Sequence, residues 1–97
     1  MRKPNDTTLK DAIQKMLKTY KLTSKIEETT IINAWPELMG MAVSNRTTQI
    51  YIHNKKLFVR IESSVIKNEL MLVRTGILEK LNERAGGGEV INEIVFL

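Results

Sequence analysis

The chain has 97 residues, of which 42% are apolar and 27% are charged, and its formal net charge is +4. This is the length of one domain with a modest core, and the absence of cysteine excludes disulfides, thiolate zinc sites and thiol nucleophiles. No apolar run approaches the roughly 20 residues that span a bilayer, and the polar start lacks the apolar segment of a secretory signal, so we expect a cytoplasmic protein.

The chain is expected to begin with a flexible basic arm over residues 1–7, followed by a single domain over residues 8–97. A helix is predicted to begin at Thr8. Its apolar positions recur at helical spacing and form one stripe: Leu9, Ile13, Met16, Leu17 and Tyr20. Within an arc of about 80° on the opposite side lie Lys10, Gln14, Lys18 and Lys21. We therefore expect one face of this helix to meet the core and a lysine stripe to meet water.

The positive charge is concentrated in this first quarter. Residues 1–25 carry seven basic and two acidic side chains, a net of +5, whereas residues 26–97 carry eight basic and nine acidic ones, a net of −1. Such asymmetry indicates an anionic partner, most often nucleic acid, and a lysine face that only aids solubility is the alternative. The candidate nucleic-acid contacts here are Arg2, Lys3, Lys10, Lys18 and Lys21.

A second helix is predicted from the capping box "SKIE" at residues 24–27 to about Trp35. Pro36 disfavours helical geometry at the residue before it, so this helix should end or kink there, and a short third helix should follow over residues 36–44. Gly40 lowers helix propensity by about 1 kcal/mol relative to Ala. We expect it to permit a close backbone approach to Trp35, which should plug the core rather than anchor a partner.

The stretch "TTQIYIHNKKLFVRIES" alternates with period two and predicts a β-hairpin with a two-residue turn at Asn54 and Lys55. The register pairs His53 with Lys56 and Thr48 with Ile61, and it sets the apolar residues on one face. Tyr51 opposite Phe58, and Gln49 opposite Arg60, share the other face. Aromatic rings beside basic groups on an open sheet can stack bases, which adds candidate nucleic-acid contacts at Tyr51, Lys55, Lys56, Phe58 and Arg60. The alternative is that the rings only pack together or are covered by the first helix.

The longest helix is predicted from Ser63 or Ser64 to about Arg84, where "AGGGE" ends it, and "VINEIVFL" reads as the last strand. The element order α-α-α-β-β-α-β predicts an α+β fold, in which the long helix packs on a three-stranded sheet. The expected core is Trp35, Gly40, Ile50, Ile52, Leu57, Val59, Ile61, Leu70, Val73 and Ile77.

Signs of catalysis are nearly absent. His53 is the only histidine and lies at a hairpin end, and the adjacent Glu27 and Glu28 point in different directions from a helix. The glycines at 86–88 follow a helix and lack the pattern of a phosphate-binding loop. We predict no enzymatic activity, no cofactor and no metal site.

A helix, "INAWPELMG", the hairpin "IYIHNKKLFVRI", "SSVIKNEL", another helix, a glycine-rich turn and "INEIVF" follow one another in this chain. This order resembles the DciA-like family of bacterial replicative-helicase loaders over essentially residues 8–97, and the short form is similar to compact members from Bacteroidetes-type bacteria. The resemblance implies a KH-like, non-enzymatic domain that binds DNA and helps to install the ring-shaped helicase at the origin.

Two departures from the implied pattern matter. KH domains that bind nucleic acid carry a GXXG loop between helices, and the glycines at 86–88 precede a strand instead. Family members with a disordered basic tail can use it for contacts with DNA or the helicase. We expect no such tail in this chain, and we expect the basic N-terminal helix to substitute for it. Two other functions stay open: a protein-interaction module, with a possible homodimer through the outer sheet face or edge strand, and an RNA-binding domain that uses Tyr51 and Phe58.

Overall fold

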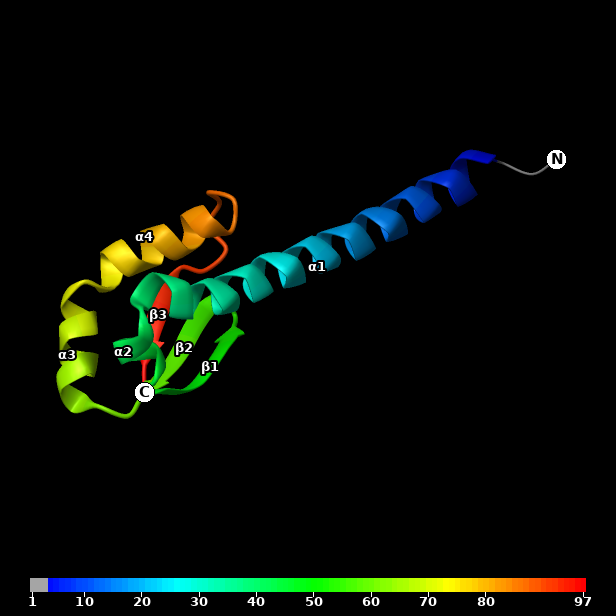
Figure 1. Ribbon diagram of the computed structural model, residues 1–97. Coiled ribbons are helices and arrows are strands. Elements are labelled where there is room, and N and C mark those ends of the chain that lie inside the picture. Colours follow the sequence, from blue (N-terminus) through cyan, green and yellow to red (C-terminus); the bar gives the residue numbers. More distant parts are fainter. Residues whose placement is uncertain (1–3) are drawn as a thin grey trace.

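The computed structural model describes the backbone of residues 4–97 and the side chains of residues 8–97. A three-stranded sheet is covered on one face by helices, and one helix extends far beyond the sheet (Figure 1), so that the molecule measures 70 × 22 × 19 Å. In chain order the elements are α1 (Pro4–Met39), α2 (Met41–Ser44), β1 (Thr47–His53), β2 (Lys56–Ile61), α3 (Ser64–Leu72), α4 (Arg74–Arg84) and β3 (Glu93–Phe96). The predicted α+β class is confirmed.

The hairpin has the predicted turn, and the predicted register is confirmed from Gln49–Arg60 to His53–Lys56. Asn54 and Lys55 have φ of 50° and 61°, and two left-handed central residues match the twist of the flanking strands. A β-bulge places Thr47, rather than Thr48, opposite Ile61. β3 pairs in parallel with β2, which gives the strand order β1-β2-β3. The prediction that the last strand joins the sheet of the hairpin is therefore confirmed.

The prediction of separate helices before the sheet is wrong, because α1 is one helix of 36 residues that begins at Pro4. Ser24 lies inside this helix. No glycine or proline between residues 5 and 23 ends a helix before Ser24, so the capping box has no helix start to cap. The helix also continues through Pro36. Proline removes one helical hydrogen bond there, and the burial of Trp35 and its neighbours holds the backbone in place despite that loss.

Gly40 separates α1 from α2, and its predicted role is corrected. It is exposed, and a Cβ built on it meets no atom within 4 Å, so it makes no close approach to Trp35 and is not part of the core. Its φ of 82° and ψ of 174° lie in a region that only glycine adopts readily. Glycine is needed at this position for the backbone turn between the two helices.

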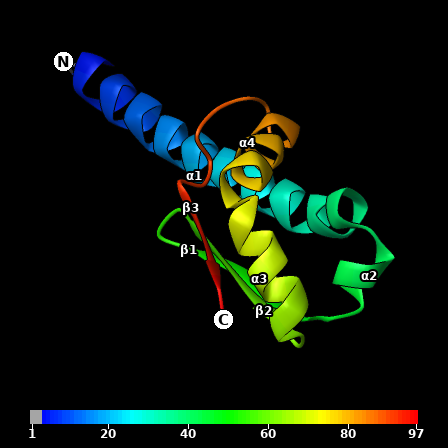
Figure 2. The same ribbon diagram turned by 90° about the vertical axis from the view of Figure 1, so that its left-hand side faces the viewer.

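The predicted long helix after the hairpin is two helices, α3 and α4, which meet at an angle (Figure 2). Ser63 caps α3 as expected, its Oγ accepting a hydrogen bond from the amide of Ile66 at 3.3 Å. Val73 has φ −111° and ψ 18°, and its amide donates to Leu70 rather than to the residue four positions before it. This break turns Val73 to the surface, where it is 55% exposed, and lets Leu70 and Ile77 both reach the core.

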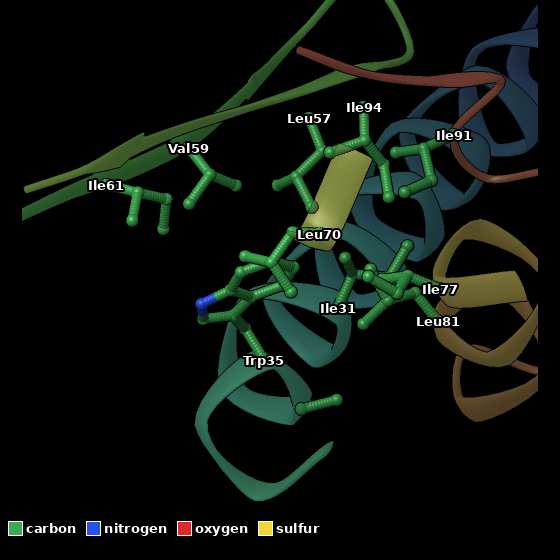
Figure 3. Packing of buried hydrophobic residues seen from close by; sticks show 11 residues of the cluster. Ile31, Trp35, Leu57, Val59, Ile61, Leu70, Ile77, Leu81, Ile91 and Ile94 are labelled. Atoms are coloured by element: carbon green, nitrogen blue, oxygen red, sulfur yellow. The ribbon is translucent and has the colours of Figure 1, made fainter. Parts of the chain in front are cut away.

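The core lies between the sheet and the helices (Figure 3). The residues α1 contributes include Trp35, whose ring lies 6.4 Å from that of Phe96. Ile50 and Ile52 are partly buried at the edge of the cluster. The buried residues are Ile31, Ala34, Trp35, Leu57, Val59, Ile61, Leu70, Ile77, Leu81, Ile91 and Ile94.

The loop between α4 and β3 is held by Asn82. Its Oδ1 accepts hydrogen bonds from the amides of Val90 and Ile91, both at 3.0 Å, and its Nδ2 donates to the carbonyl of Ile91 at 2.9 Å. Gly86 and Gly87 end α4 with φ of 115° and 89°. One side chain thus fixes the approach of the chain to β3.

Candidate nucleic-acid interface

The N-terminal half of α1 projects from the domain (Figure 1). Every side chain from Thr8 to Thr23 is exposed, including Lys10, Lys18 and Lys21. None of these three lysines makes an ion pair with a residue whose side chain the structure describes. The helix rises 1.5 Å per residue, so the three span about 16 Å along its axis. Arg2 and Lys3 lie outside the described residues.

Two further exposed lysines of this helix were missed as candidates. Lys15 and Lys25 were assigned to neither the apolar stripe nor the lysine stripe, although both lie in the basic first quarter. Lys15 lies outside the arc that holds Lys10, Lys18 and Lys21, and Lys25 fell in the predicted second helix. Since no described residue covers this part of α1, every lysine on it is accessible to a phosphate.

The candidate lysines of the hairpin lie among carboxylates. Lys55 lines a hollow of about 290 Å³, together with Glu27, Glu28 and Glu89. Lys56 Nζ lies 3.4 Å from Glu93 Oε2. Because nearby negative charges offset both ammonium groups, this corner of the domain is a weaker site for an anion than the projecting helix.

On the outer sheet face, the rings of Tyr51 and Phe58 stack on each other, with centroids 4.9 Å apart and planes at 11°. Arg60 lies two residues after Phe58 on the same face, opposite Gln49. Its Nε donates a hydrogen bond to Gln49 Oε1 at 3.4 Å. The stacked rings turn one face each toward the other, so a base finds only the outward ring faces. This geometry favours the cross-strand packing alternative over a base-stacking platform.

Apart from Lys55 and Lys56 at the hairpin turn, the predicted contacts among the described residues fall on two separate surfaces. α1 packs on the face of the sheet formed by Leu57 and Val59, and Tyr51 and Phe58 lie on the opposite face. The projecting helix carries exposed lysines that have no ion-pair partner among the described residues, and the sheet carries the aromatic pair. Of the two, the surface suited to phosphates is the projecting half of α1.

Other kinds of site find little support in the part of the chain that the structure describes. Over these residues, no group of three or more His, Cys, Asp or Glu side chains is placed to hold a metal ion. None of the described helices combines the length and the apolar character that crossing a membrane requires.

Comparison with known proteins agrees with the sequence resemblance. Residues 8–96 match the family described as Dna[CI] antecedent, DciA. No curated protein matches the chain. The family match extends from the projecting half of α1 to the last residue of β3, so it covers both the basic helix and the whole sheet. The chain therefore belongs to the DciA family.

Proposed function

We propose that this protein is a non-enzymatic adaptor that binds DNA through the lysines of the projecting half of α1 and recruits the replicative helicase. Family membership supports a helicase-loader type of role. The observation that carries the DNA half is the projecting helix itself, on which residues 8–25 bear five lysines and one aspartate, all exposed.

Contacts of this kind are made to phosphates and not to bases. Lysines on a helix surface neutralise phosphates, release counterions and give binding that depends on salt but little on sequence. The KH type of clamp finds no support at the corresponding place. The junction of α3 and α4 reads Val73-Arg74-Thr75-Gly76, which lacks the GXXG pattern of that clamp.

Charge reversal tests the proposal. In a variant with Lys10, Lys18 and Lys21 changed to Glu, we expect affinity for single-stranded and duplex DNA, measured by fluorescence anisotropy at low salt, to fall at least about ten-fold. The matched control reverses three exposed basic residues of the folded domain, Arg46, Arg74 and Lys80, and so changes the net charge equally. Equal losses in the two variants would contradict a specific role of α1.

Recruitment of the helicase is tested separately. We expect the replicative helicase of the source cell to co-purify with the chain. The variant with Lys10, Lys18 and Lys21 changed to Glu should co-purify with it as well, because these substitutions leave the domain intact. If the helicase binds and DNA does not, the chain is a protein-interaction module. If Tyr51→Ala weakens binding of single-stranded RNA more than reversal of the three lysines does, the chain is instead an RNA-binding domain that uses the sheet face.

A further inference from the structure

The projecting half of α1 bears an apolar stripe that no described residue covers. The exposed fractions are 64% for Leu9, 45% for Ile13, 63% for Met16, 51% for Leu17 and 72% for Tyr20. The stripe was expected to pack on the core of its own domain, and that expectation is wrong because the helix runs straight past the sheet (Figure 2). Monomeric proteins rarely expose contiguous apolar patches above roughly 300–600 Å².

This stripe continues the buried face of the same helix. Eighteen residues are five full turns of an α-helix, so positions that differ by 18 lie on the same side. The exposed Ile13, Met16, Leu17 and Tyr20 each precede by 18 a residue that packs in the core, respectively Ile31, Ala34, Trp35 and Leu38. One side of α1 is therefore apolar over most of its length, and the domain covers only the second half of it.

The spacing of the exposed stripe is that of a helix–helix seam. Leu9, Ile13, Met16 and Tyr20 are separated by four, three and four residues, which is the alternation of the two apolar positions of a heptad. Of the lysines on this segment, only Lys10 flanks the seam, and the other four lie on the outward positions. A second helix could therefore pack along the seam without burying ammonium groups.

We infer that this stripe packs against the same stripe of a second copy of the chain, as an antiparallel pair of α1 helices. The seam is self-complementary about the midpoint between Gln14 and Lys15. Around that point, Leu9 of one copy faces Tyr20 of the other, and Ile13 faces Met16. A two-fold interface requires this reciprocity.

The position of the domain favours the antiparallel orientation. The domain sits on the apolar side of α1, since Ile31 and Trp35 are buried against it. In a parallel pair, both domains would lie between the two helices at the same level and would collide. In an antiparallel pair, the projecting half of one α1 lies beside the projecting half of the other. The two domains then lie at opposite ends.

The size of the seam fits such a pair. Five large apolar side chains from each copy bury on the order of 1,000 Å² in total, which is the lower end for a specific interface. An isolated helix as short as the projecting half is also marginal in water, so a second helix supplies packing that this half otherwise lacks.

The mass of the full chain in solution tests the inference. Light scattering after size exclusion, from about 10 µM to 1 mM, is expected to give twice the chain mass of 11.1 kDa at the upper concentrations. Met16→Glu is expected to weaken the dimer at least about 100-fold, because it places a carboxylate in the apolar seam. The control Gln14→Glu adds the same charge off the seam. Both side chains are exposed in one copy, so both variants should keep the unfolding midpoint at concentrations where the chain is a monomer.

Three results would overturn the inference. The first is a monomer at all concentrations, and the second is a Met16→Glu variant that dimerises like the Gln14→Glu control. The third is a monomer that sediments with anionic phosphatidylglycerol vesicles through this stripe, which would assign it to a lipid surface.

The orientation is tested by disulfides, since the chain has no cysteine of its own. In an equal mixture of Ile13→Cys and Met16→Cys chains, mass spectrometry is expected to find mainly the mixed disulfide. A predominance of the symmetric Met16→Cys disulfide would contradict the antiparallel arrangement.

Discussion

Trp35 joins the helical and sheet parts of the core. Its ring is 1% exposed, and its Nε1 donates to Thr47 Oγ1 at 3.1 Å. The Thr47 hydroxyl in turn donates to the carbonyl of Val43 at 2.9 Å. The indole therefore fills the core with its carbon atoms and has its polar group satisfied at the start of β1, which leaves no part of it available to a partner.

Replacement of Trp35 is expected to act on stability and not directly on binding. Trp35→Ala should lower the free energy of unfolding by about 3–5 kcal/mol, because it leaves a cavity in the core. Trp35→Phe should cost less, because it retains most of the apolar volume and loses the bond to Thr47. Urea unfolding measures both. A Trp35→Ala variant of unchanged stability that no longer binds its partner would contradict this account.

Asn82 was not singled out by the sequence, and the structure gives it three hydrogen bonds to the backbone before β3. Asn82→Ala is expected to lower the free energy of unfolding by about 2 kcal/mol or more, since two amides and a carbonyl lose their partner. Asn68→Ala is the matched control, on the exposed surface of α3. Thermal unfolding of the two variants compares them, and equal midpoints would show that the loop does not depend on Asn82.

At the scale of the elements, local patterns predicted the sheet better than the helices. The alternation of the hairpin and its two-residue turn determine the register, because a slip of one residue would move Leu57 and Val59 out of the core. Helix boundaries depend instead on what the rest of the molecule covers. The capping box at 24–27 and Pro36 are both real preferences. The first is overridden because no glycine or proline ends the helix before it, and the second by the burial of Trp35 and its neighbours.

The two glycines nearest the helix junctions are expected to respond oppositely to alanine. Gly40→Ala should lower the free energy of unfolding by about 1–3 kcal/mol, because of the φ of 82° and not for want of space. Gly76 lies inside α4, and a Cβ built on it meets no atom within 4 Å. Gly76→Ala should therefore raise the free energy of unfolding by up to about 1 kcal/mol. Chemical unfolding measures both, and a neutral Gly40→Ala variant would contradict the strain argument.

At the scale of the whole molecule, the sequence shows where the basic residues lie along the chain but not which of them share a surface. Lys10, Lys18 and Lys21 share one exposed helix as expected, whereas Lys56 is paired with Glu93, from a strand distant in sequence. The stacking of Tyr51 on Phe58 likewise depends on side-chain geometry that the register alone does not determine. That half of α1 leaves the domain also escaped prediction, because an amphipathic stripe looks the same whether the partner surface belongs to the same chain or to another molecule.

This arrangement separates two tasks along one helix. The second half of α1 packs in the folded domain, and the first half extends its basic surface into solvent (Figure 1). Because the core residues run from Ile31 to Ile94, changes in the projecting half alter the surface without removing any core side chain. The DNA contacts that we propose for this half can therefore be varied independently of the fold.

The salt dependence of DNA binding tests the central claim most directly. Each lysine that contacts a phosphate of duplex DNA adds about 0.9 to the slope of log affinity against log salt concentration. The variant with Lys10, Lys18 and Lys21 changed to Gln should therefore give a slope that is flatter by about two to three than that of the unmodified chain. Identical slopes for the two proteins, or no binding of the unmodified chain even at low salt, would contradict the assignment of DNA binding to the projecting half of α1.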